Sequence, residues 1–219
     1  MDVSLAAAKP AHVSRQITGA SKRMAAPAAT GLSNFARGSR SSKAGDVNFR
    51  ERKAIIEMGG ITPLAQSLDE KNGEFLMTCA ADALANLAVD DTARQAVGSS
   101  QAIEKLVGIL AEAAHPDADP AHKKSDLSEY AAACLRNLAL EENNAVKMAE
   151  FGAIPALIQL SIDANPVTRG MCACCLACIA KDKHRCEQIC DYGAAGPLIR
   201  MLSMPEEVCQ LSAAGCLVS

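Results

Sequence analysis

The amino-acid sequence predicts an all-α protein in which a unit of three helices is repeated along the chain. Hydrophobic residues make up 49% of the sequence, but aromatic residues make up only 3% and Trp is absent, so the core must be built from aliphatic side chains and cysteine. A second observation is that one apolar pattern recurs at a nearly fixed interval. Within each copy, the apolar residues follow helical spacing.

Residues 1–47 are predicted to form a flexible basic tail. They lack the spaced large apolar residues that would offset the entropy lost on ordering. The first 46 residues contain seven basic and two acidic residues, whereas the remainder contains 15 basic and 23 acidic residues. A stretch near residues 28–36 resembles the end of a repeat helix and is interpreted as a degenerate copy. The acid-poor composition is also typical of an organellar transit peptide, which is the second interpretation of the tail.

Charge and hydropathy exclude several classes of function. The acidic balance after residue 47 argues against a phosphate-binding surface, so nucleic acid is not an expected partner. The sequence has no run of about 18 apolar residues, and no membrane span is predicted. It also lacks an apolar segment at the N-terminus, and Asp2 follows Met1, so neither secretion nor myristoylation is predicted. We expect a cytoplasmic protein, with the nucleus as an additional location.

The second helix of each unit is predicted from four aligned apolar stripes. Four residues separated by 42, 51 and 41 positions begin these stripes: Ile61, Ile103, Ile154 and Ala195. From each of them, apolar side chains stand at offsets of three, four and seven, and only Ser161 breaks the pattern. The longer middle interval contains a loop-like insertion at residues 115–122. Prolines lie near the start of three of these helices: Pro63, Pro155 and Pro197.

The first and third helices are predicted on either side of this stripe. A short helix precedes a glycine corner in three units, at Gly59-Gly60, Gly152 and Gly193. A third helix closes each unit, and its last turn has a related sequence at residues 84–88, 135–139 and 176–180. The fourth copy stops early, at Leu217-Val218-Ser219, so the last unit is expected to be truncated.

The three helices per unit, the Gly-Ala-Ile-Pro-like corner and the Leu-x-Asn-Leu-Ala ending together resemble the armadillo repeat over about residues 48–219. The resemblance implies a right-handed α-solenoid of about four repeats, with a concave groove lined by the third helices. It also implies a non-catalytic scaffold or adaptor that holds a protein segment or extended peptide in this groove. Two alternatives remain: the substrate-recognition part of a ubiquitin ligase, and a nuclear-transport adaptor.

The resemblance also suggests binding residues, because the Asn of the third helix typically faces the groove in this family. Here those residues are Asn86 and Asn137, whose amides can donate to and accept from a peptide main chain. Asp82 and Glu129 lie on the same two predicted helices, and their carboxylates favour a basic or neutral ligand. The positions that match Asp82 in the other units carry no Trp, unlike those of nuclear-import adaptors, which argues against that role. A simpler interpretation is that the four are solvated or capping polar residues.

No catalytic motif is present. The sequence has no Gly-rich phosphate loop, nucleophile elbow, zinc-protease helix or kinase signature, so we expect neither an enzyme nor a small-molecule substrate or cofactor. Four cysteines could suggest a zinc site: Cys172, Cys174, Cys175 and Cys178. Cys175, however, shares a column with Ala83, Cys134 and Cys216, which indicates a small buried packing residue.

The insertion contains metal-ligand residue types, namely His115, Asp117, Asp119 and His122. Its prolines and the adjacent Lys123-Lys124 favour a solvated loop instead. We therefore expect no metal in either place.

Overall fold

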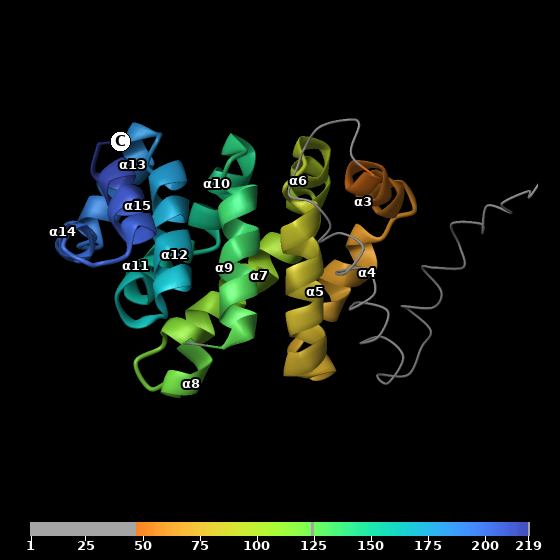
Figure 1. The fold of residues 1–219 in the computed structure, drawn as a ribbon, viewed down its shortest axis with the longest axis horizontal. Coiled ribbons are helices and arrows are strands. Elements are labelled where there is room, and N and C mark those ends of the chain that lie inside the picture. The colour runs from red at the N-terminus through yellow and green to blue at the C-terminus, as the bar shows by residue number, and fades with distance from the viewer. Residues whose placement is uncertain (1–46, 124, 219) are drawn as a thin grey trace, which may run out of the picture.

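The computed structural model describes residues 47–123 and 125–218, and all the regular elements in these ranges are helices (Figure 1). The predicted all-α solenoid is therefore confirmed. The predicted basic tail and the degenerate copy near residues 28–36 lie outside the described residues, except for residue 47 at the end of the tail.

The helices form four successive units, each with a first, a second and a third helix. The first unit consists of α3 (Val47–Glu57), α4 (Ile61–Ser67), the 3-10 helix η1 (Glu70–Asn72) and α5 (Glu74–Leu87). The second consists of α6 (Asp91–Gly98), α7 (Ala102–Ala114), the short α8 (Pro120–Lys123) and α9 (Asp126–Leu138). The third consists of α10 (Glu142–Glu150), α11 (Ala153–Asp163) and α12 (Pro166–Ile179). The fourth consists of α13 (Lys183–Asp191), α14 (Ala195–Leu202) and α15 (Glu207–Val218).

Local sequence signals set where these helices begin and turn. Asp90 begins α6 by accepting a hydrogen bond from the backbone N–H of Thr92. Asp182 begins α13 by accepting one from the backbone N–H of Arg185. Gly152 and Gly193 stand at the predicted corners with φ of +79° and +76°, a left-handed conformation that suits glycine. The corner of the second unit instead uses residues 99–101 without a positive φ.

The core runs continuously through the four units. The third helices α5, α9, α12 and α15 pack side by side, and the second helix of each unit packs behind its third helix (Figure 1). The predicted apolar columns are buried here, as shown by Leu64, Leu106 and Leu157, which are fully buried. Ser161, which breaks the pattern, is also buried, and its hydroxyl donates to the Ile158 carbonyl at 2.7 Å.

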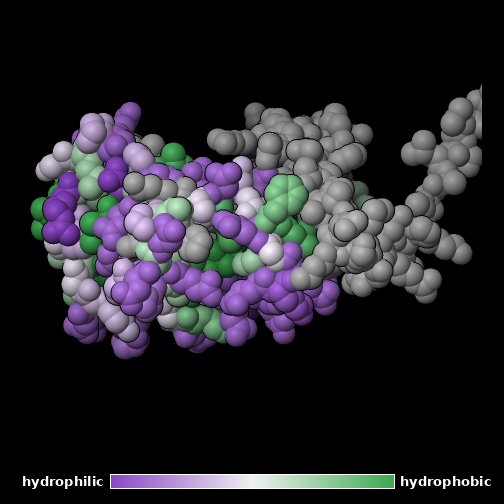
Figure 2. Space-filling model, turned by 90° about the horizontal axis from the view of Figure 1, so that it is seen from below, coloured by the Kyte–Doolittle hydropathy of each residue, from purple (hydrophilic) through white to green (hydrophobic). Residues whose placement is uncertain are grey.

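The stripe of the fourth unit differs from the other three. Ile199 and Leu202 on α14 are exposed, whereas Ala65 and Val107, which match Ile199 in the first and second units, are buried. In those units the second helix packs against the second helix of the next unit, and within the described residues no further unit covers α14. Figure 2 shows hydrophobic side chains at the end of the molecule that carries α14 and α15, and a further group nearer the middle of the same face among hydrophilic ones.

Within the described residues, no single helix is long and apolar enough to cross a membrane. Only α10 and α11 taken together reach the required length and composition, and they meet at an angle of 91°.

Candidate binding surface

The third helices offer one open surface. Their rear sides are covered by α4, α7, α11 and α14, so exposed side chains of α5, α9, α12 and α15 point away from the second helices. We call this surface the third-helix face. Equivalent residues of successive units lie in rows across it, because the helices stack side by side (Figure 1).

Asp82 and Asn86 form a pair on α5. The Asn86 amide nitrogen donates to both the side-chain Oδ1 and the main-chain carbonyl of Asp82, each at 2.9 Å. Asp82 is only 7% exposed, whereas Asn86 is half-buried. The carboxylate therefore orients the amide at the surface, and Asn86 is the more accessible of the two.

Asn137 is more buried than the exposed position expected from the sequence, with only 8% of its surface accessible. Its amide nitrogen donates to the Ala85 carbonyl of α5 at 2.9 Å, and its oxygen accepts from Arg136 at 2.7 Å. Asn137 thus joins the first two units.

Glu129 joins the second and third units. Its Oε2 accepts from the Asn165 side-chain amide at 3.2 Å, while the Asn165 oxygen caps α12 by accepting from the Thr168 N–H at 2.9 Å. Glu129 and Asn137 are eight residues apart on one helix, or about 12 Å. The structure therefore places all four predicted residues on third helices but does not gather them into one compact site.

The sequence interpretation missed the apolar residues of this face. Phe75, Val167 and Leu211 are exposed at 69%, 50% and 65%, on α5, α12 and α15. Beside them, Tyr130 and Met171 are half-buried and pack on the core. The available signal was register, since Phe75 and Val167 occupy the same position in the first and third units. Leu211 stands apart from them, because it matches Glu129 and Gly170 in the second and third units. We call Phe75, Tyr130, Val167 and Met171 the apolar stripe.

Exposed charges flank the stripe on both sides. Glu74 and Asp126 lie in the first turns of α5 and α9, where carboxylates complement the helix dipole. Arg136 lies in the last turn of α9, and Lys181 follows the end of α12. Acidic and basic groups therefore border opposite edges of the third-helix face.

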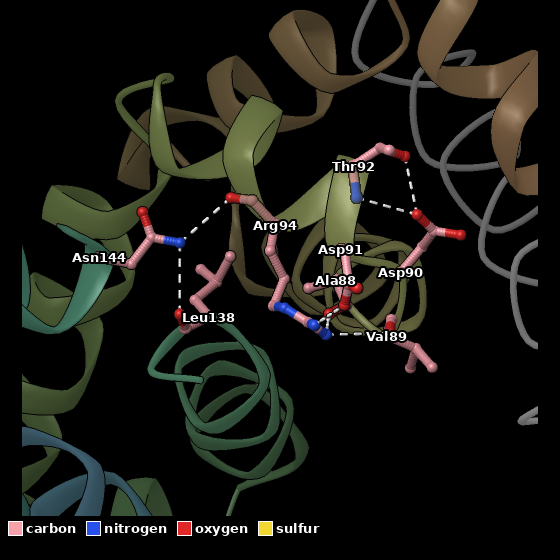
Figure 3. Close-up of polar contacts among 8 residues, drawn as sticks. All are labelled: Ala88, Val89, Asp90, Asp91, Thr92, Arg94, Leu138 and Asn144. Atoms are coloured by element: carbon pink, nitrogen blue, oxygen red, sulfur yellow. Dashed lines mark hydrogen bonds and ion pairs between the residues drawn. The ribbon is translucent and has the colours of Figure 1, made fainter. Parts of the chain in front are cut away.

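Polar contacts between units hold this face in shape (Figure 3). Asn144 of α10 is buried, and its amide donates to the carbonyls of Arg94 and Leu138 at 3.1 and 3.2 Å. Arg94 in turn donates to the Val89 carbonyl at 3.0 Å, just beyond the end of α5. The Leu138 and Val89 carbonyls lie at or just after helix ends, which leave carbonyls without intrahelical partners. The bonds to them fix a first helix against the end of a preceding third helix, and the bond from Asn144 to Arg94 joins the first helices α10 and α6.

The cysteines of α12 behave as packing residues. Cys172 and Cys175 are fully buried, and burial raises the pKa of the Cys172 thiol to about 12 and that of Cys175 well above its usual value. The described residues contain no group of three or more His, Cys, Asp or Glu that could hold a metal ion. In the insertion, the side chains of His115, Asp117 and Asp119 are exposed, but residues from Pro120 onward form the short helix α8 instead of the expected loop.

A hollow of about 370 Å³ lies away from the apolar stripe, between α4, η1 and α7. Lys105 reaches into it and forms an ion pair with Asp69 at 2.7 Å, while also donating to the Ala65 carbonyl at 3.0 Å. Hydrogen bonding from Lys105 lowers the pKa of the Asp69 carboxyl. The Lys105 ammonium is therefore already used within the fold and is not a candidate ligand contact.

Comparisons with known proteins identify the fold. Neither a scan against models of protein families nor a search of curated proteins finds a match. Among solved structures, computationally designed armadillo repeat proteins for modular peptide recognition superpose with a TM-score of 0.79 at 23% identity, covering 96% of this chain and 81% of that one. A designed armadillo repeat protein in complex with the peptide (KR)4 gives a TM-score of 0.77 at 23% identity, covering 95% and 80%. An engineered protein gives 0.76 at 25% identity, covering 96% and 80%.

Proposed function

Because the chain has the armadillo-repeat fold, we propose that it is a scaffold or adaptor that binds an extended segment of another protein along the third-helix face. The observation that carries this proposal is the face itself: four stacked helices present exposed apolar and polar side chains in register. A cytoplasmic location and the absence of catalysis belong to the same proposal. No observation favours a ubiquitin-ligase or nuclear-transport role over this general one.

The arrangement suits an extended partner for a physical reason. Side chains of neighbouring helices repeat along the solenoid axis, so a segment lying across the helices meets similar positions in each unit. The cross-unit hydrogen bonds of Asn137 and Asn144 hold those positions fixed before binding. A preorganised surface loses less entropy on binding and therefore binds more tightly.

The test is selection from a random library of 12-residue peptides displayed on phage, followed by fluorescence polarisation with the selected peptides. Asn86→Ala removes an accessible amide on the third-helix face and is expected to weaken binding about tenfold. The matched control is Asn143→Ala, which removes an exposed amide on the first helix α10. An equal loss of affinity in both variants would contradict the proposal. So would a selected peptide whose affinity is unchanged by every substitution on the third-helix face.

A further inference from the structure

We propose that the third-helix face recognises a segment of low net charge that presents large apolar side chains every two to three residues. This inference rests on the proposed function, because it names the class of segment for the same surface. Its anchor is the apolar stripe formed by Phe75, Tyr130, Val167 and Met171.

The distribution of aromatic residues gives the first argument. Four aromatic residues have described side chains, and all are exposed or half-buried: Phe75, Tyr130, Phe151 and Tyr192. The core instead consists of aliphatic residues, methionine and cysteine. Aromatic side chains on a surface are common among the residues that dominate binding energy at interfaces. Two of the four lie in the stripe, on the neighbouring helices α5 and α9.

The register of the stripe gives the second argument. Tyr130 and Met171 occupy the same position of α9 and α12, and Phe75 and Val167 share the position one turn earlier. On α9 the position of Phe75 carries Asp126, and on α15 the position of Tyr130 carries the buried Ser212. The apolar stripe therefore extends over the three successive third helices α5, α9 and α12, which pack side by side. One partner that crosses the helices can cover it.

The charges of the third-helix face favour a partner segment of low net charge over one rich in Lys or Arg. Asp82 is nearly buried and bonded to Asn86, and Glu129 is bonded to Asn165. The positions that match Asp82 in the other units carry no charge: Ala133, Cys174 and Gly215. The exposed acids at one edge of the face, Glu74 and Asp126, are balanced by Arg136 and Lys181 at the other. Such a face offers no continuous acidic surface to a polybasic segment.

Dimensions agree with an extended segment. Packed helices lie about 8–10 Å apart, and an extended chain advances about 3.3 Å per residue, so each unit corresponds to two to three residues. The small side chains of Ala133 and Cys174, one turn beyond Tyr130 and Met171, leave room for the main chain of the segment to approach. About 6–9 residues would cross the stripe.

The experiment uses the full chain and the random 12-residue phage library. We expect the selected peptides to be enriched in Leu, Ile, Met or Phe at spacings of two to three, with little net charge and little dependence of binding on salt. In fluorescence polarisation, Phe75→Ala and Val167→Ala should each lower the affinity for the selected peptide about tenfold. The matched control is Phe151→Ala, an exposed aromatic at the end of α10 and outside the stripe; it should leave affinity unchanged.

Enrichment of Lys and Arg with strongly salt-dependent binding would overturn the inference and leave the proposed function standing, provided that Asn86→Ala still weakens binding. Loss of binding in Phe151→Ala but not in Phe75→Ala would move recognition to the helix corners and overturn it as well. A chain that sediments as a dimer, and as a monomer after Phe75→Ala, would show that a second copy covers the stripe. The absence of any enriched peptide would instead count against the proposed function itself.

Discussion

At the residue scale, Asn86 and Asn137 show that one repeat position can serve two purposes. Both occupy the same position of neighbouring third helices. Asn86 bonds within its own helix, whereas Asn137 crosses to the Ala85 carbonyl of α5. The difference arises because α9 follows another third helix, and α5 has no earlier third helix within the described residues. We therefore expect Asn137 to contribute mainly to stability, and we propose that Asn86 is the one of the two that is available to a partner.

We predict that Asn137→Ala lowers the free energy of unfolding by about 1–3 kcal/mol, because a buried hydrogen bond between two units is lost. Asn86→Ala should cost less than about 1 kcal/mol, since its bonds lie at a half-buried surface within one helix. Urea unfolding followed by circular dichroism measures both. A larger loss for Asn86→Ala would reverse the assignment of the two roles.

Gly98 allows the close approach of Asn144, and we predict that Gly98→Ala is destabilising by roughly 1–3 kcal/mol. A methyl group there would overlap the side-chain oxygen of Asn144 and push its amide away from the Arg94 and Leu138 carbonyls. The matched control is Gly108→Ala in α7, where nothing lies within 4 Å of the added methyl. That change should stabilise the protein by about 0.5–1 kcal/mol, because Ala favours helix. Similar melting temperatures for the two variants would refute the contact.

At the scale of the element, α9 and α12 carry the central part of the core. Leu135 of α9 is fully buried, and Leu140, just after the same helix, is exposed. We expect Leu135→Ala to cost on the order of 2–5 kcal/mol, because it removes buried methyl groups and leaves a cavity. Leu140→Ala is the matched control and should change the unfolding free energy by less than about 0.5 kcal/mol. Equal costs would mean that the predicted inner column is misplaced.

The buried thiols of α12 predict a dependence of stability on alkaline pH. Burial raises the pKa of Cys172 to about 12, so the folded chain keeps a proton that the unfolded chain loses near pH 8.5. The contribution of this thiol to the free energy of unfolding is therefore fully present below about pH 8, and it is lost as the pH rises above the usual thiol pKa. Urea unfolding at pH 7.5 and 10.5 should show a smaller decrease for Cys172→Ala than for the unchanged protein. Exposed Cys190→Ala is the control, and a decrease equal in both variants would contradict this origin.

At the scale of the whole molecule, the repeated pattern predicted the architecture because each unit buries its apolar stripe only by stacking on the next. Leu64, Leu106 and Leu157 are found in the core as their spacing predicts. The bond from Asn137 to Ala85 could not be predicted, because it depends on the distance between two helices that are far apart in sequence. The exposure of Phe75 could not be predicted either, because the register that it shares with Val167 identifies a repeated apolar position but not whether a neighbour covers it.

The stacking also predicts how stability is distributed along the molecule. Helices α9 and α12 each pack between two third helices, whereas α15 packs mainly against α12 among the third helices described. In a linear array, stability depends on the interfaces with nearest neighbours, so a unit with one such interface opens at lower free energy. We expect hydrogen exchange measured by mass spectrometry to be slowest in peptides from α9 and α12 and faster in those from α14 and α15. Leu135→Ala should accelerate exchange in α9 and in its neighbours α5 and α12, because it weakens their shared interfaces. Exchange that is uniform along the chain would show that the units open only together, and exchange slowest in α15 would show that its exposed surface is covered in solution.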